Sequence, residues 1–142
     1  MPFEFDIFPN LNLIWNRGYG TTTMAQALSN MLNNKAHPDY HEALDTLSDM
    51  RAMVETNIDF KSLSSARPTI QSRVMVLDKP AKSAVYVPTE LGYGMGNIYI
   101  KMMEGTPNLD ARLFTDINEA LDFLIIPSEQ RQLFVDGKPQ QD

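Results

Sequence analysis

The sequence predicts one α/β domain with a mixed, mostly parallel sheet, an N-terminal antiparallel hairpin and about four flanking helices. Apolar residues alternate with polar ones over residues 3–15, which is typical of two strands joined by a tight turn. Beyond residue 20, segments with helical spacing of apolar residues alternate with short apolar runs, as in sheets whose parallel strands are connected by helices. We expect the domain to cover residues 1–127, followed by a loosely held C-terminal tail over residues 128–142.

The predicted hairpin has a turn at Pro9-Asn10. The alternating apolar residues are Phe3, Phe5 and Ile7 before this turn and Leu11, Leu13 and Trp15 after it. Gly18-Tyr19-Gly20 then closes the second strand. The spacing of Thr23 and Gln26 predicts a capping box at the start of the first helix, in which each side chain binds a free N–H group.

The first helix is expected to end near Lys35, because Pro38 cannot continue it. Its apolar stripe consists of Met24, Ala27, Leu28, Met31 and Leu32. Residues 43–50 predict a further strand, while residues 58–63 fit either a short strand or a turn. We expect Ser65 to cap the second helix, with Pro68 in its first turn and an end at Lys79-Pro80. Its expected stripe is Ile70, Val74 and Leu77.

The C-terminal half predicts two further strands, at residues 83–87 and 111–114. Between them, the third helix continues to about Glu104, with a stripe formed by Leu91, Met95, Ile98 and Met102. Asp116 and Glu119 have the spacing of an N-cap pair for the last helix, which ends before Pro127.

The composition excludes several classes of protein. The 142-residue chain has 43% hydrophobic and 21% charged residues, which is ordinary for a globular domain. No apolar run approaches the roughly 20 residues that span a bilayer, and the first residues do not resemble a signal peptide, so we expect a cytoplasmic protein. The lack of cysteine excludes disulfides and thiolate metal sites. A net charge of −6 with scattered basic residues argues against binding to nucleic acid.

Several short strings, in this order and spacing, resemble the small SpoIIAA-like proteins, which are relatives of the STAS domain. The strings are Phe5-Asp6-Ile7, Leu11-Asn12-Leu13-Ile14, Gly20-Thr21, Pro38-Asp39-Tyr40, Leu47-Ser48-Asp49-Met50-Arg51, Tyr93-Gly94 and Ala120-Leu121-Asp122-Phe123-Leu124. The resemblance extends over residues 3–126. It implies a SpoIIAA-like fold that binds a protein partner, and the similar CRAL-TRIO fold is associated with lipid binding.

In STAS-type anti-anti-sigma factors, phosphorylation of a serine in an Asp-Ser-Ser-Gly-like turn controls partner binding. The nearest counterpart here is residues 59–65, where Ser62 and Ser64 are the candidate regulatory serines. This stretch lacks both the adjacent Asp-Ser pair and the glycine of that motif, so capping and turn formation are the favoured explanation of its serines.

The Tyr93-Gly94-Met95-Gly96 segment is the candidate rim of a ligand pocket, because it connects a buried strand to a helix at the carboxyl edge of the sheet. Its glycines match neither the dinucleotide-binding pattern nor the P-loop, so a tight turn with close helix–sheet packing is the simpler interpretation. Trp15 is a further candidate for this rim, and Tyr19, Tyr86 and Tyr99 could join it unless they are ordinary core residues.

Candidate chemistry elsewhere is sparse. Both histidines lie in the segment from His37 to His41, where a solvated loop is favoured over a metal site. Asp45 and Asp49 are most simply solvated charges on or beside a strand. We find no nucleophile with a base, and therefore expect neither an enzyme nor a cofactor.

Two functions remain open. One is a noncatalytic STAS-like interaction or regulatory module that binds a protein partner or a second copy of itself through its acidic surface and residues 59–65. The alternative is a carrier or sensor of a small apolar or amphipathic, lipid-like ligand, held between the sheet and the helix over residues 91–103.

Overall fold

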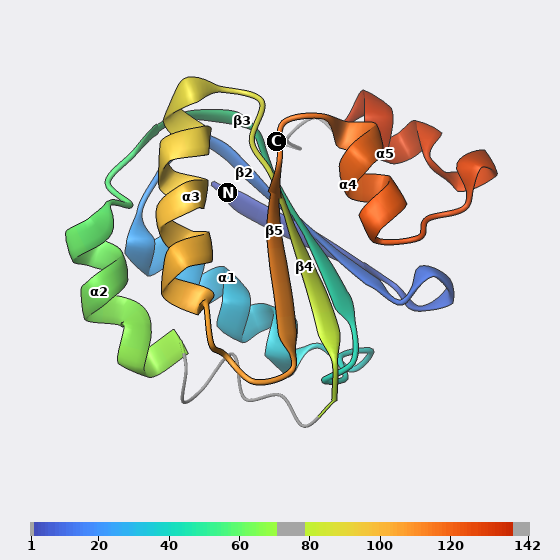
Figure 1. The fold of residues 1–142 in the computed structure, drawn as a ribbon, viewed down its shortest axis with the longest axis horizontal. Coiled ribbons are helices and arrows are strands. Elements are labelled where there is room, and N and C mark those ends of the chain that lie inside the picture. Colours follow the sequence, from blue (N-terminus) through green and yellow to red (C-terminus); the bar gives the residue numbers. More distant parts are fainter. Residues whose placement is uncertain (1, 71–78, 138–142) are drawn as a thin grey trace.

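A computed structural model describes residues 2–70 and 79–137 as an α/β domain built on one five-stranded sheet (Figure 1). The strands lie in the order β1-β2-β3-β4-β5. They are β1 (Phe3–Phe8), β2 (Leu13–Thr22), β3 (Asp45–Thr56), β4 (Ala81–Tyr86) and β5 (Leu109–Phe114). The helices are α1 (Met24–Ala36), α2 (Phe60–Thr69), α3 (Glu90–Met103), α4 (Ile117–Phe123) and α5 (Gln132–Asp136). None of the helices in these two ranges is long and apolar enough to cross a bilayer.

The predicted mixed sheet is confirmed. β1 and β2 are antiparallel, while β2, β3, β4 and β5 are mutually parallel. The short turn at Pro9–Leu11 is a 3₁₀ helix, and Asn12 follows it with a positive φ of 52°. The first strand pair is therefore a hairpin at one edge of the sheet, as the alternation predicts.

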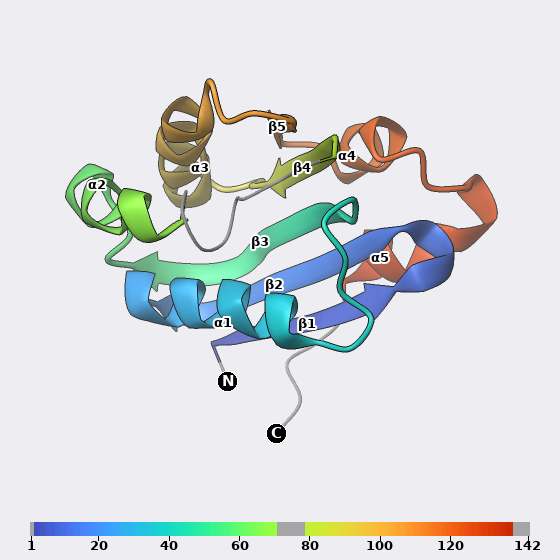
Figure 2. The same cartoon turned by 90° about the horizontal axis from the view of Figure 1, so that it is seen from below.

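The helices form two groups on opposite sides of the sheet (Figures 1 and 2). α1, α2 and α3 lie on one side, where α2 packs beside both α1 and α3. α4 and α5 lie on the other side, where their buried residues pack with those of β2, β3 and β4. Because successive residues of a strand point to opposite faces, each strand contributes alternate side chains to the two layers.

The first helix begins as predicted. Thr23 is its N-cap, and the capping box with Gln26 is complete in both directions. The strand expected at residues 43–50 is also present, but β3 continues to Thr56 because its backbone stays paired with the second half of β2.

The predicted start of the second helix is wrong. Asp59, not Ser65, is the N-cap of α2, and Pro68 lies in the last turn rather than the first. Residues 58–63, which fit a strand or a turn, therefore contain a capping residue and the first turn of a helix. Ile70 is buried as expected, whereas Val74 and Leu77 lie outside the described residues.

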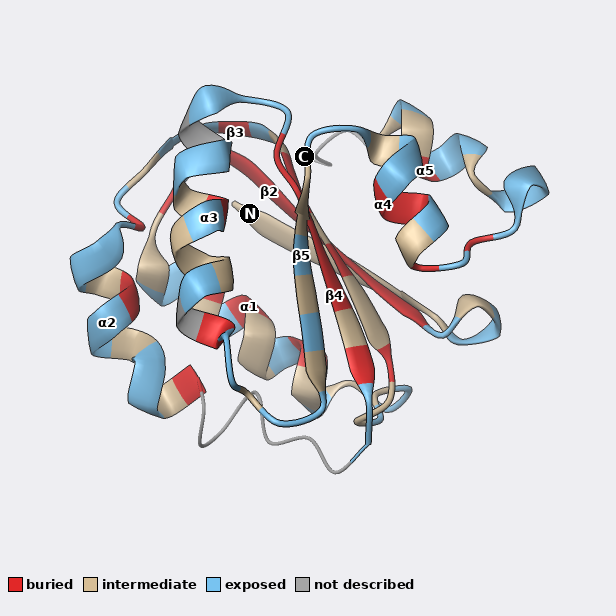
Figure 3. Ribbon diagram, viewed as in Figure 1, coloured by how far each residue is buried: buried red, intermediate tan, exposed pale blue. Residues whose placement is uncertain are grey.

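Residues 128–137 pack against the sheet, which corrects the expectation of a loosely held tail for this part of the chain. Asp116 caps α4 as predicted, by accepting hydrogen bonds from the N–H groups of Asn118 and Glu119. After Pro127, a 3₁₀ turn at Ser128–Gln130 leads into α5, where Phe134 is only 1% exposed. Figure 3 shows buried residues in α4, on the side of this helix that is turned toward the sheet. The Phe134 ring packs against Trp15 and Phe8 with centroid distances of 4.9 and 5.4 Å. Residues 128–137 thus complete the core on the α4–α5 side.

Candidate functional site

Two adjoining cavities lie between α1, α3 and the face of the sheet that these helices cover. The methionine cavity, near the carboxyl ends of the strands, has a volume of about 70 Å³ and is lined by Met24, Met31, Met50 and Met95. The amino-edge cavity, near the other end, has a volume of about 80 Å³. The cavities share Asn16, Met31, Ser48 and Tyr99 as lining residues, so they form one interrupted cleft.

Asparagine side chains from β2 and α1 lie at the floor and wall of this cleft. Asn16, Asn30 and Asn34 are only 6%, 8% and 6% exposed. Asn30 donates a hydrogen bond of 2.8 Å from its Nδ2 to Oδ1 of Asn16, and Asn34 donates one of 2.9 Å to the Asn30 carbonyl. Within the described ranges, no group accepts a hydrogen bond from Nδ2 of Asn16. A donor nine-tenths buried therefore remains available to a molecule in the cleft.

The local sequence explains why these asparagines point inward. Asn16 lies two residues after Ile14 on β2, so both side chains reach the same face of the sheet. Asn30 follows Ala27 by three residues on α1, which places it on the buried stripe of that helix.

Tyr99 from α3 stands at the junction of the two cavities. Burial raises the pKa of Tyr99 to about 12, and a hydrogen bond with Ser83 opposes only part of this rise. Ser83 is itself only 4% exposed, so the hydroxyl end of Tyr99 is enclosed even though the residue as a whole is half-buried. The environment at the centre of the cleft therefore disfavours a charged group.

The described lining of the methionine cavity carries no charged side chain. It consists of Phe3, Asn16, Met24, Ala27, Asn30, Met31, Ser48, Met50, Ile58, Val85, Met95 and Tyr99. Four of the nine methionines of the chain belong to this set. Methionine side chains adapt to occupants of different shape, so the volume of this cavity is adjustable.

The structure separates the predicted rim residues. Met95 lines the methionine cavity, whereas Tyr93 is 49% exposed and Gly94 is also exposed. Trp15 is fully buried on the opposite face of the sheet, against Phe134, and does not line this cleft.

The glycines of the predicted rim lie inside α3 rather than in a turn before it. A Cβ atom at Gly96 would lie 2.7 Å from Cδ1 of Leu113 and 3.4 Å from Val85, while one at Gly94 would meet no neighbour within 4 Å. The predicted close helix–sheet packing is therefore confirmed at Gly96, whereas the predicted tight turn is wrong.

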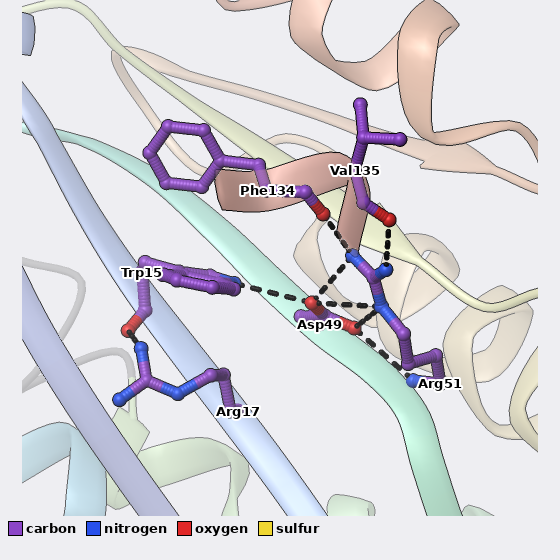
Figure 4. A network of polar contacts seen from close by, with 6 residues as sticks. All are labelled: Trp15, Arg17, Asp49, Arg51, Phe134 and Val135. Carbon is purple, nitrogen blue, oxygen red and sulfur yellow. Dashed lines mark hydrogen bonds and ion pairs between the residues drawn. The ribbon is translucent and has the colours of Figure 1, made fainter. Parts of the chain in front are cut away.

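The other face of the sheet carries a buried polar network (Figure 4). Asp49 is only 3% exposed, which corrects the expectation that it is a solvated charge. Its Oδ2 accepts a hydrogen bond of 3.1 Å from Nε1 of Trp15, and Arg51 Nη2 lies 2.9 Å from the same oxygen. Arg51 also donates hydrogen bonds to the carbonyl groups of Phe134 and Val135. Both oxygens of the Asp49 carboxylate accept hydrogen bonds. Through Arg51, this network holds α5 against β3, and it leaves no carboxylate oxygen of Asp49 available for a reaction.

Asp45, which the sequence analysis considered together with Asp49, has a separate role. Its Oδ1 accepts a hydrogen bond of 2.9 Å from the backbone N–H of Lys82, where β3 pairs with β4. Asp45 is half-buried and, being four residues from Asp49 along β3, points to the same face of the sheet. It is not one of the residues of the network in Figure 4.

The two candidate regulatory serines differ in environment. Ser62 completes the capping box of α2: its Oγ accepts the N–H of Asp59 at 2.8 Å, and its N–H binds the Asp59 carboxylate. These hydrogen bonds hold the pKa of Asp59 below its usual value. Ser64 is exposed on the first part of the helix. The structure thus assigns Ser62 a capping role and leaves Ser64 accessible.

The histidine segment does not converge on a site. The ring of His37 packs edge-on against Phe5 at 5.9 Å, whereas His41 is exposed. Over residues 2–70 and 79–137, no three His, Cys, Asp or Glu side chains are grouped so that they could hold a metal ion.

Sequence reasoning missed the asparagines of the cleft, because polar residues within amphipathic segments are usually assigned to solvent. The available signal was the position of Asn30 and Asn34 on the same helical face as Ala27. Comparisons of the chain with protein-family models, with curated proteins and with solved structures found no match.

Proposed function

We propose that this chain is a noncatalytic SpoIIAA-like protein that binds a small amphipathic ligand in the cleft between α1 and α3. The observation that carries the proposal is the pairing of adjustable methionines with the unpartnered, nine-tenths buried donor of Asn16. Nδ2 of Asn16 is not one of the fully enclosed polar atoms without a partner, so it remains accessible to a molecule in the cleft. A ligand that accepts a hydrogen bond from this donor would replace water there while its apolar part contacts the methionines.

The SpoIIAA-like part of the proposal rests on the ordered sequence strings and on their agreement with the fold. The mixed sheet with an antiparallel first pair is the architecture that the resemblance implies. A cytoplasmic location is part of the same proposal.

Native mass spectrometry of the purified full chain tests ligand binding. We expect a fraction of the protein to carry a co-purifying small molecule that is released on unfolding. The proposal is abandoned if no such species is found and no small amphipathic compound perturbs the methyl signals of Met24, Met31, Met50 and Met95 in NMR spectra.

A second candidate is an interaction module that binds a protein partner or a second copy of this chain. Three exposed apolar residues favour it, namely Val54, Phe60 and Tyr93, which are 69%, 67% and 49% exposed near the carboxyl ends of the strands. Ser64 lies on the same helix as Phe60 and would be the regulatory serine. Light scattering and pull-down experiments with the wild type and with Phe60→Ser test this candidate. A strict monomer that captures no partner in either form excludes it.

A further inference from the structure

The methionine cavity carries a specific pattern of hydrogen-bonding groups. Asn30 gives one Nδ2 hydrogen to Asn16 Oδ1, which leaves Nδ2 of Asn16 as a donor and Oδ1 of Asn30 as an acceptor. Both side chains line this cavity and are more than nine-tenths buried. Among the described residues neither of these two atoms has a hydrogen-bond partner. The cavity therefore offers a donor and an acceptor side by side on a hydrogen-bonded amide pair.

The environment of this pair disfavours a charged occupant. No described residue that lines the methionine cavity carries a charge, so a carboxylate or phosphate there would lose its hydration without gaining a counter-ion. The raised pKa of Tyr99, at the junction of the cavities, reports the same resistance to charge.

The size of the cleft limits the ligand. The methionine cavity, at about 70 Å³, is roughly half as large as an engineered cavity of about 150 Å³ that binds benzene. It accommodates a small molecule of a few heavy atoms, whose polar group would lie at the Asn16–Asn30 pair and whose short apolar part would contact the four methionines.

Resting on the proposed function, we infer that the ligand is an uncharged molecule with a secondary or primary amide, whose C=O accepts from Asn16 Nδ2 and whose N–H donates to Asn30 Oδ1. An amide presents an acceptor and a donor, which complements the pair, whereas a ketone uses only the donor of Asn16. Asn16 and Asn30 are then the residues that determine specificity, and the four methionines surround the apolar part.

Three probes of equal heavy-atom number and similar shape test the inference: N-propylacetamide, 2-hexanone and pentanoate. Each is titrated into the full chain with isotope-labelled methionine methyl groups. We expect the amide to shift the signals of Met24, Met31, Met50 and Met95, while Met53, which is buried against Thr22 outside both cavities, stays unchanged. The amide should bind about fivefold more tightly than the ketone, since one further hydrogen bond is made, and pentanoate should bind most weakly.

The outcomes separate the inference from the proposed function. If ketone or carboxylate shifts the same four methyl signals with an affinity equal to that of the amide, the amide inference is overturned and ligand binding stands. If none of the three probes shifts these signals, the amide inference is overturned, and ligand binding is overturned with it when native mass spectrometry also finds no co-purifying species.

A pair of asparagine variants adds a second test. Asn16→Ala should abolish the preference for the amide over the ketone, whereas Asn33→Ala, an exposed position on the same helix as Asn30, should retain it. A preference unchanged in folded Asn16→Ala overturns the inference. If Asn16→Ala does not fold, the comparison of the three probes on the wild type decides the question by itself.

Discussion

The substitution Phe134→Ala tests whether the C-terminal segment belongs to the core. The Phe134 ring is 1% exposed and makes edge-on contacts with Trp15 and Phe8. Removing a buried phenylalanine ring loses its transfer free energy and leaves a cavity, which together cost about 3–5 kcal/mol. We expect a loss of this size in the free energy of unfolding, although the residue lies close to the end of the chain.

Urea unfolding followed by tryptophan fluorescence measures this loss, because Trp15 is the single tryptophan and is fully buried beside Phe134. The matched control is Leu133→Ala, since the neighbouring leucine is 46% exposed and its truncation should cost less than about 1 kcal/mol. Equal stability of the two variants, or a cost below about 1 kcal/mol for Phe134→Ala, would refute the packing of α5 against the sheet.

Three further predictions follow from the buried polar groups and the caps. Arg51→Met should destabilise the fold by about 3 kcal/mol, because Asp49 stays buried without its cation, and adding Asp49→Asn should restore part of the loss in the same urea assay. Stability should fall between about pH 10 and pH 12, because the unfolded chain ionises the Tyr99 phenol near its ordinary pKa whereas the folded protein resists ionisation until about 12. Urea midpoints across this range should decline less for Tyr99→Phe, and an equal decline would contradict burial of the hydroxyl. Thr23→Ala should cost about 1 kcal/mol through loss of the α1 cap, and calorimetry that detects no change in melting temperature would count against the capping box.

Local patterns predicted most of the elements because each depends on neighbouring residues. The Thr23–Gln26 capping box and the Asp116 cap both satisfy helix N–H groups within a few residues, so their spacing alone indicates them. The start of α2 was missed although Asp59 and Ser62 have the same spacing, because Ser65 before Pro68 offered a competing start. The second half of β3 was missed because Val54 is exposed and the segment is held by backbone pairing with β2.

The candidate site was predicted only in part, because it depends on which residues meet across the sheet. The helix over residues 91–103 was correctly expected beside a cavity, and Met95 lines it. Trp15 was expected at the same rim, but its neighbour Asn16 faces the cleft instead, since adjacent strand residues point to opposite faces. To choose between these two faces, one must know which helices cover each face. The alternation of residues along a single strand does not give this information.

The buried polar groups on the two faces of the sheet differ in how completely they are hydrogen-bonded. On the α4–α5 side, both oxygens of the Asp49 carboxylate are bound by Trp15 and Arg51, and Arg51 extends the network to α5. On the α1–α3 side, Asn16 and Asn30 bind each other and leave one polar atom each facing a cavity. Neither of these two atoms is fully enclosed; among the described residues, the enclosed side-chain atoms without a partner are Nε of Arg17, whose guanidinium lies over Trp15, and Oγ1 of Thr106. The Asn16–Asn30 pair is therefore open to a molecule in the cleft, and a ligand with a complementary donor and acceptor would replace water at this pair.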